Sequence, residues 1–213
     1  MLPSLVSFSG YPSAGKDAAA DLLVSRARYA KTYMTKPLEQ ALLRVDPWIV
    51  DHKENTIERF SDLHENLGFD ATRNFEEVRR LLGVGSYFGQ SLLGLNVWNN
   101  LVFDEIQTLQ GLGKSVALSG VGHPKELSLV RECGGVSVWI NRDTARAPKS
   151  LPMLITPEDC DIVVDNNGTL RELYIKLIIA FEEYTEKEDE ENEDNTEDTL
   201  VIASKNEESN DVG

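Results

Sequence analysis

The sequence predicts an α/β fold in which a central parallel sheet of about five strands lies between layers of helices. Short apolar segments alternate with helical or loop segments along the chain, which is typical of a parallel sheet. These segments are evenly apolar, which indicates that the sheet is covered on both faces. The five expected strands are residues 5–9, 29–34, 115–119, 136–140 and 161–164.

The first expected strand, residues 5–9, runs into a phosphate-binding loop with the sequence Gly-Tyr-Pro-Ser-Ala-Gly-Lys-Asp. Gly10, Gly15 and Lys16 have the spacing of the motif G-x-x-x-x-G-K-[ST], which needs a buried strand before it and a helix after it. An alanine-rich segment that begins at Ala18 predicts this helix. The alternative, a glycine-containing turn with a surface lysine, explains neither the strand nor the helix. The three-layer fold of P-loop NTPases is therefore expected.

ATP is the ligand that such a loop predicts. Its phosphates would accept hydrogen bonds from successive backbone N–H groups at the positive end of the helix, and Lys16 would bridge the outer phosphates. Asp17 stands where the motif has Ser or Thr, and its carboxylate is expected to bind Mg²⁺ directly or through water. The loop residues expected to bind the cofactor are Gly10, Ser13, Ala14, Gly15, Lys16, Asp17 and Ala18.

The second expected strand is followed by a long and mostly helical region, residues 37–110, in which charged and apolar residues recur at helical spacing. We expect this insertion to carry the site for the phosphoryl acceptor. Residues 111–115, Gly-Leu-Gly-Lys-Ser, look like a second phosphate loop, but Thr108 stands where the first glycine is needed. The segment also follows a helical pattern and precedes a strand, so it is interpreted as a helix-to-strand turn.

Composition divides the chain into a body, residues 1–181, and an acidic tail, residues 182–213. The 213 residues are 41% hydrophobic, which suits one domain with a full core. The tail holds 14 acidic and 2 basic residues, so it carries most of the net charge of −15. It cannot bury enough apolar surface to offset chain entropy, which predicts disorder. We interpret it as a solubilising appendage, with a basic partner or nucleic-acid mimicry as alternatives.

Several kinds of function are not expected from the composition. Cys133 and Cys160 stand alone and the three histidines lack metal-ligand spacing, so neither a disulfide nor a zinc site is predicted. No apolar segment suits a signal peptide or a membrane span. We expect a soluble, cytoplasmic protein with a small-molecule nucleotide substrate, no membrane contact and no direct nucleic-acid binding. A homodimer is left open.

From about residue 4 to residue 178, the order of motifs resembles the phage-type deoxynucleoside monophosphate kinases, which are P-loop proteins built like adenylate kinase. The Gly-Lys-Asp ending of the loop is one mark of that family. The other matching segments are Lys36-Pro-Leu-Glu-Gln-Ala-Leu, Asp46-Pro, Glu77-Val-Arg-Arg-Leu-Leu, Gly85-Ser-Tyr-Phe-Gly-Gln, Asn96-Val-Trp98, His123-Pro-Lys-Glu, Gly134-Gly135 and Asp165-Asn-Asn-Gly-Thr-Leu-Arg-Glu-Leu173. The resemblance implies a kinase that transfers the γ-phosphoryl group of ATP to a deoxynucleoside 5′-monophosphate with Mg²⁺, in the cytoplasm of an infected host cell if the gene is viral.

The chain departs from the family pattern at four positions. Gly120 and Gly122 stand where the family has the Asp and Arg of D-V-R-F-P-N-E. Gln90 replaces an arginine, and Ala18 replaces a threonine. Phosphoryl transfer depends on positioning and charge neutralisation, so these losses would slow it unless other groups substitute. A degenerate kinase fold that binds a nucleotide or a protein partner without turnover is therefore the alternative function, and another small-molecule kinase is a third.

Other basic and aromatic residues are candidates to complete the site. Arg79 and Arg142 are expected to assist Lys16 in catalysis, and Arg146 is expected to bind the cofactor; all three could equally be ordinary surface arginines. The acceptor site is expected to use His52, Arg80, Tyr87 and Trp98, in which the aromatic rings stack on a base. Aromatic residues at helical spacing are more often core residues, so that interpretation also stays open.

Overall fold

The computed structural model describes residues 2–51, 54–146 and 154–187. His52 and residues 188–213 of the acidic tail lie outside the described residues. A five-stranded parallel sheet forms the centre of the molecule, in the order β2-β5-β1-β6-β7. Its strands are β1 (Leu5–Ser9), β2 (Ala30–Tyr33), β5 (Val116–Ser119), β6 (Val136–Asn141) and β7 (Ile162–Asp165).

Each of the five predicted strands is present, and no strand boundary differs from its prediction by more than one residue. The middle position of β1 in the sheet explains why all five of its residues are buried. The phosphate-loop sequence connects β1 to α1 (Lys16–Ala27), as the motif requires. The predicted fold class, the three-layer P-loop NTPase fold, is confirmed.

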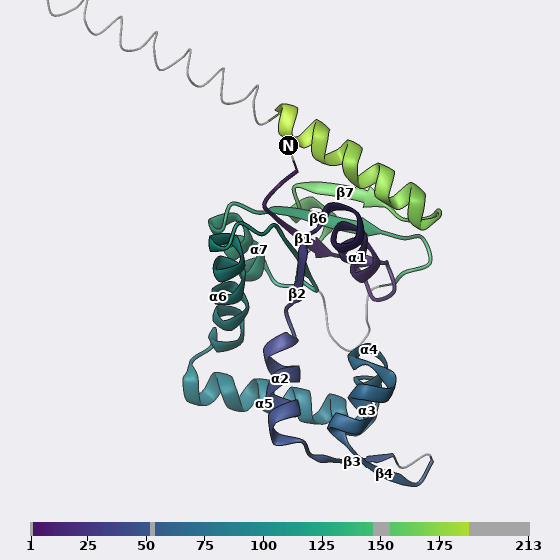
Figure 1. The fold of residues 1–213 in the computed structure, drawn as a ribbon, viewed down its shortest axis with the longest axis vertical. Helices are drawn as coiled ribbons and strands as arrows, with labels where there is room; N and C mark the ends of the chain where they lie inside the picture. Colours follow the sequence, from purple (N-terminus) through teal and green to yellow (C-terminus); the bar gives the residue numbers. More distant parts are fainter. Residues whose placement is uncertain (1, 52–53, 147–153, 188–213) are drawn as a thin grey trace, which may run out of the picture.

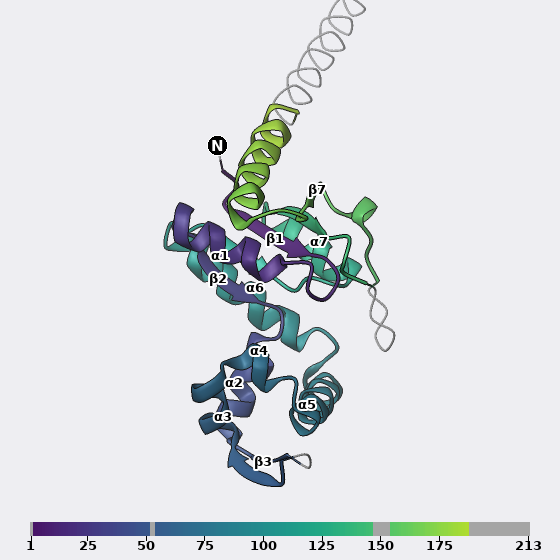
Figure 2. The same cartoon turned by 90° about the vertical axis from the view of Figure 1, so that its right-hand side faces the viewer.

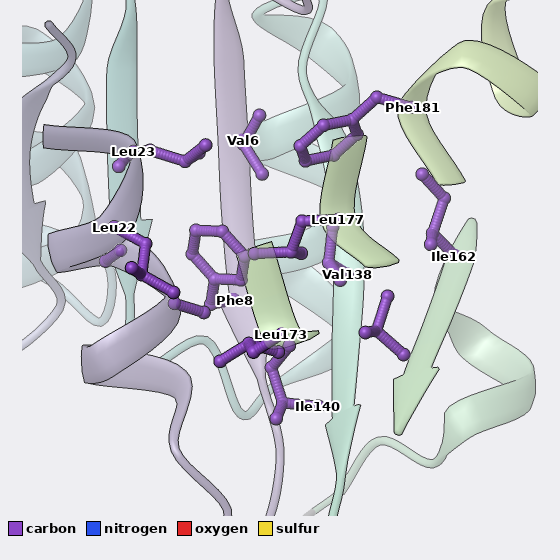
Figure 3. Close-up of a cluster of buried hydrophobic side chains, with 14 of the residues drawn as sticks. Val6, Phe8, Leu22, Leu23, Val138, Ile140, Ile162, Leu173, Leu177 and Phe181 are labelled. Atoms are coloured by element: carbon purple, nitrogen blue, oxygen red, sulfur yellow. The ribbon is translucent and has the colours of Figure 1, made fainter. Parts of the chain in front are cut away.

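Helices cover both faces of the sheet (Figures 1 and 2). On one face, Val6 and Phe8 of β1 pack against α1 and against a C-terminal helix over residues 170–187. Figure 3 shows this layer, with Leu173, Leu177 and Phe181 of that helix directed toward the strands. Because strand side chains alternate, Leu5 belongs to the opposite face. That face is covered by α6 (Val97–Gly111) and α7 (Pro124–Glu132).

The start of α7 is determined by local sequence. His123 is its N-cap, and its Nδ1 atom accepts a hydrogen bond from the backbone N–H of Lys125 at 3.2 Å. Glu126 accepts hydrogen bonds from the backbone N–H groups of Gly122 at 2.8 Å and His123 at 3.1 Å. This is a capping box, in which two side chains satisfy the free donors of the first turn. Pro124, whose dihedral angle suits the first helical position, completes the signal.

A second lobe, residues 36–93, extends away from the carboxyl edge of the sheet (Figures 1 and 2). We call it the helical lobe. Its elements are α2 (Lys36–Val45), β3 (Trp48–Asp51), β4 (Thr56–Arg59), α3 (Phe60–Leu67), α4 (Phe69–Thr72) and α5 (Glu76–Leu93). The antiparallel hairpin of β3 and β4 is an addition to the mostly helical pattern that the sequence predicts. The lobe has its own small core of Leu42, Ile49, Phe60, Leu63 and Val78.

The helix α6 lies between the helical lobe and the body. The sequence places it inside the insertion at residues 37–110, whereas its buried residues Val102, Phe103 and Ile106 pack on the sheet. It ends at Gly111, and β5 begins at Val116, so residues 111–115 form the predicted helix-to-strand turn. A short 3₁₀ helix, η1 (Pro157–Asp159), precedes β7. Among the described helices, none has the length and apolar character needed to cross a membrane.

Candidate functional site

The phosphate loop has a backbone that needs its two glycines. Gly10 has a φ of 145° and Gly15 a φ of 102°, both in the region that side chains other than glycine rarely adopt. A Cβ atom on Gly10 would lie 2.6 Å from the backbone oxygen of Ile140. A Cβ atom on Gly15 would overlap the Nδ2 atom of Asn166. The glycines therefore serve both loop curvature and close packing against the sheet.

Asn166 anchors the loop and is a residue that sequence reasoning did not assign to the site. It follows β7 and is 5% exposed. Its Nδ2 atom donates a hydrogen bond to the backbone oxygen of Ala14 at 2.8 Å, and its own N–H donates to Asn141 at 2.7 Å. The last strand of the sheet thus supports the loop that follows the first strand. The polar sequence Asp-Asn-Asn-Gly at the end of β7 was its available signal.

A pocket of about 580 Å³ opens beside the loop, at the carboxyl edge of the sheet. This is the edge at which parallel α/β folds bind ligands. The pocket lies between the body and the helical lobe, because residues of both parts line it. Its walls are Pro12, Lys16 and Asp17 of the loop and α1; Lys31, Tyr33, Met34 and Thr35 of β2 and the residues after it; Phe69 and Arg73 of the lobe; and Ser119 and Gly120 at the end of β5.

Asp17 and Ser119 place two oxygen atoms that could bind a metal ion on the pocket wall. The hydroxyl of Ser119 donates a hydrogen bond to Oδ1 of Asp17 at 2.8 Å. Carboxylate and hydroxyl oxygens, supplemented by water and phosphate oxygens, are the ligands that Mg²⁺ prefers. The described residues contain no cluster of three or more acidic, His or Cys ligands, so a metal ion here would take the rest of its coordination from water and a bound nucleotide.

Three cationic side chains, Lys16, Lys31 and Arg73, line the same pocket as the carboxylate of Asp17. Lys31 forms an ion pair with Asp21 of α1, with Nζ and Oδ1 2.7 Å apart, so part of its charge is already balanced. Arg73 reaches the pocket from the opposite side, immediately after α4. Cations at both ends of the pocket suit an anionic ligand that extends from the loop toward the helical lobe.

Two aromatic rings form the wall next to Arg73. Tyr33 and Phe69 are stacked, with ring centroids 6.2 Å apart and an interplanar angle of 26°. The Tyr33 hydroxyl donates a hydrogen bond to the buried carboxylate of Glu39, whose other oxygen lies 2.5 Å from Nε2 of His64. These contacts restrict the orientation of the Tyr33 ring. The wall therefore presents apolar, planar surface beside a cation, which is suited to a nucleobase and a phosphate.

The structure brings together only part of the set of residues predicted from the sequence. Lys16 and Asp17 line the pocket, and Gly10, Ser13, Ala14, Gly15 and Ala18 belong to the loop and the start of α1 beside it. The pocket lining does not include Arg79, Arg80, Tyr87, Trp98, Arg142 or Arg146.

The residues outside the lining have other surroundings. Arg80 pairs with Glu77 on the surface of α5 at 2.5 Å. Trp98 donates from Nε1 to the backbone oxygen of Ser86 at 3.1 Å and lines an apolar groove on the helical lobe. The Trp98 ring packs against Gly89 of α5, where a Cβ atom would lie 2.7 Å from its Cε2 atom. Tyr87 is 75% exposed on α5.

Arg142 and Arg146 follow β6 and are exposed. Arg146 donates to the backbone oxygen of Ala145 at 2.9 Å. The segment after it, residues 147–153, lies outside the described residues. The two arginines stand near the carboxyl edge of the sheet without reaching the pocket that Lys16 and Asp17 line.

Sequence reasoning missed Lys31, Ser119 and Arg73. Ser119 had a signal, because it is a polar residue at the carboxyl end of a strand in the parallel sheet. Lys31 had a weaker one, as a charged residue within an expected strand. Arg73 had none, since only the path of the chain through the helical lobe returns it to the phosphate loop.

Comparisons with known proteins give distant similarities. No family model matches the chain, and neither does any curated protein sequence. Among solved structures, shikimate kinase from Aquifex aeolicus is 12% identical with a TM-score of 0.40, over 84% of this chain and 96% of that one. Dephospho-CoA kinase from Campylobacter jejuni is 12% identical with a TM-score of 0.42, over 85% and 97%.

A third solved structure, the APS kinase of Mycobacterium tuberculosis in complex with AMPPNP and APS, is 16% identical with a TM-score of 0.39, over 85% of this chain and 98% of that one. At these identities and scores, a substrate must be argued from the residues of the chain itself.

Proposed function

We propose that this protein is a nucleotide kinase that transfers the γ-phosphoryl group of ATP to a deoxynucleoside 5′-monophosphate. The observation that carries the proposal is the continuous pocket that runs from Lys16 of the phosphate loop to Arg73 and Phe69 of the helical lobe. One end has the features of a site for the donor phosphates, and the other has a cation beside stacked rings. The motif order, which resembles phage-type deoxynucleoside monophosphate kinases, supports the same acceptor.

The reaction needs no catalytic base. An oxygen of the acceptor phosphate, already ionised at neutral pH, forms a bond to the γ-phosphorus, while the bond between that phosphorus and the bridging β-γ oxygen breaks. The products are ADP and a deoxynucleoside diphosphate. The protein's part is to hold both anions in line and to neutralise their charge. Lys16 and the loop N–H groups suit the donor, and Arg73 and Lys31 suit the acceptor or the transferring group.

Asp17 and Ser119 are the residues that would hold Mg²⁺, directly or through its water ligands. When bound, the ion would neutralise charge on the donor phosphates and help to orient them. The Ser119 hydroxyl holds the carboxylate of Asp17 in one orientation, and this hydrogen bond is present without a metal ion.

The test is ADP formation from Mg·ATP with each deoxynucleoside and ribonucleoside monophosphate in turn. Lys16→Ala should abolish turnover, because the lysine neutralises the outer phosphates. Lys114→Ala is the matched control, since Lys114 follows a glycine in the exposed turn before β5 and lies outside the pocket. Stimulation by one deoxynucleotide, lost in Lys16→Ala and kept in Lys114→Ala, is the expected result. Turnover that survives in Lys16→Ala would refute the proposal.

A second candidate function is nucleotide binding without turnover. The observation that favours it is the open backbone at Gly120, which lines the pocket where the resembling family has an acidic side chain. A Cβ atom there would meet nothing within 4 Å, so no other side chain lies directly against this position. ATP binding that depends on Lys16, together with no phosphoryl transfer to any monophosphate, would favour this candidate. Phosphoryl transfer to a different small metabolite would instead identify another kinase activity.

A further inference from the structure

One acidic side chain of the helical lobe is buried behind the aromatic wall of the pocket. Among the described residues, Glu39 of α2 is the one charged residue that is fully buried, at 5% exposure. It is not part of the pocket lining. Burial of a carboxylate costs free energy unless partners satisfy its oxygens. The position of Glu39 therefore has to be explained by its partners.

Both carboxylate oxygens of Glu39 have a partner. The hydroxyl of Tyr33, the last residue of β2, donates a hydrogen bond to Oε2. Nε2 of His64 on α3 lies 2.5 Å from Oε1. Because a carboxylate oxygen accepts hydrogen bonds, the proton of this second contact belongs to Nε2 of the imidazole. Glu39 thus connects the end of β2 with α3, and its two hydrogen bonds fix the direction of both partner side chains.

His64 also supports the second ring of the wall. Its imidazole lies near Phe69, with ring centroids 6.3 Å apart, and near Phe60, with centroids 6.0 Å apart. Phe60 belongs to the buried core of the lobe, which limits the movement of His64. Phe69 in turn stacks on Tyr33. The pair of Glu39 and His64 therefore contacts both rings of the pocket wall, one through its hydroxyl and the other through the imidazole.

Stability alone does not explain this pair. Apolar side chains of similar volume would bury as much surface without the cost of removing polar groups from water, so a buried polar pair is weak evidence for stability. A fully satisfied buried network does make one arrangement of its side chains rigid. Here that arrangement includes two rings that face an open pocket, where packing holds them from one side only. The pair thus supplies orientation at a surface where packing is incomplete.

We propose that Glu39 and His64 are positioning residues for the nucleobase of the acceptor. They hold the rings of Tyr33 and Phe69 in the plane on which the base stacks, so that less ordering is needed when it binds. This inference rests on the proposed function, because it concerns the same acceptor site. Base stacking is about equally strong in the ground state and the transition state. Loss of the pair should therefore raise KM for the monophosphate and leave kcat unchanged.

The test is calorimetric titration of the full chain with each of the four deoxynucleoside 5′-monophosphates, which requires no turnover. Glu39→Leu removes both hydrogen bonds at similar volume and should weaken monophosphate binding by about 5- to 50-fold, the size of a stacking contribution. ATP affinity should stay unchanged. Glu39→Gln should keep most of the monophosphate affinity, because its amide can accept from Tyr33 and donate to the other tautomer of His64.

Two further variants separate ring orientation from stability. Tyr33→Phe keeps the ring and removes only the hydroxyl, so it tests the same contact if Glu39→Leu does not fold; it should weaken monophosphate binding by about 3- to 10-fold. Ile49→Ala is the matched control, because Ile49 is a buried residue of the lobe core on β3 and lies outside the pocket lining. It should lower the melting temperature and leave monophosphate affinity unchanged. Circular dichroism checks the fold of every variant.

The outcomes separate this inference from the proposed function. If none of the four monophosphates binds to the wild-type protein, the proposed function fails and the inference fails with it. If they bind equally well to the wild type, Glu39→Leu and Tyr33→Phe, only the inference is overturned. A loss in Glu39→Gln or in Ile49→Ala as large as that in Glu39→Leu would also overturn it, because affinity would then depend on charge or on lobe stability rather than on ring orientation.

Discussion

At the residue scale, the phosphate loop depends on contacts made by residues far away in sequence. Gly15 is packed against Asn166, which in turn holds the carbonyl of Ala14. The motif predicts that glycine is needed here for loop conformation, and the structure adds a second reason, which is the absence of space. Asp17 likewise has its orientation determined by Ser119, which is 102 residues away in sequence.

We therefore expect Gly15→Ala to destabilise the protein and to damage the nucleotide site together. The new Cβ would overlap the Asn166 amide at a φ of 102°, so the loop must move. The free energy of unfolding should fall by about 1–3 kcal/mol, and ATP affinity should fall at least tenfold. Urea unfolding and ATP titration measure the two effects. Gly111→Ala, at the end of α6 with nothing within 4 Å, is the control; an equal loss in both variants would contradict the explanation.

At the element scale, the position of α4 decides which arginine reaches the pocket. This short helix and the turn after it bring Phe69 and Arg73 opposite the phosphate loop. Arg79, six residues later on α5, is exposed outside the pocket lining. A sequence-based choice between these arginines had no basis, because α4 has four residues and no distinctive pattern.

In a kinase assay, Arg73→Ala should therefore lower kcat/KM for the acceptor by about 10- to 1000-fold, because a desolvated contact to a phosphate is worth about 1.5–3 kcal/mol or more. Arg79→Ala should have a clearly smaller effect. Initial rates at varied acceptor concentration measure both. A larger loss of kcat/KM in Arg79→Ala than in Arg73→Ala would assign the catalytic role to Arg79, as the sequence predicts.

The packing of α5 on α6 depends on one of the glycines of α5. A Cβ on Gly89 would lie 2.7 Å from the Cε2 atom of the Trp98 ring and closer still to the neighbouring ring carbon, whereas a Cβ on Gly83 would meet nothing within 4 Å. Gly89→Ala should lower the free energy of unfolding by about 1–3 kcal/mol through overpacking. Gly83→Ala should raise it by about 0.5–1 kcal/mol, since alanine favours a helix. Thermal unfolding of both variants measures the difference, and a shift of the same sign in each would contradict this account.

At the scale of the whole molecule, burial between the layers shifts the pKa of Tyr29 and so makes the stability of the fold depend on pH. Tyr29 leads into β2 and is buried, with its hydroxyl donating to the backbone oxygen of Pro3. Burial raises the pKa of Tyr29 to about 12, from an ordinary value of 10. The neutral phenol is thus favoured in the folded state. Its contribution to stability is fully present below pH 10 and is lost as the pH rises toward 12.

The expected observation is a decline in the free energy of unfolding between pH 10 and pH 12 that is smaller in Tyr29→Phe, because phenylalanine cannot ionise. Urea unfolding at a series of pH values measures it. The Phe variant also loses the hydrogen bond to Pro3, so it should start lower at neutral pH. Declines of equal size in the two proteins would show that other groups cause the alkaline loss.

The sequence by itself determined the layers of this protein. Buried strands and their order along the chain are local patterns, and residues 5–17 contain a complete strand, loop and helix start, so the sheet and Lys16 could be predicted. Tertiary structure alone decided which residues share the pocket. Lys16, Ser119 and Arg73 are distant in sequence, and they meet because neighbouring parallel strands end at one edge and the helical lobe folds back over it. The pattern of α5 likewise shows an apolar helix, but only its packing shows that much of its apolar face remains exposed.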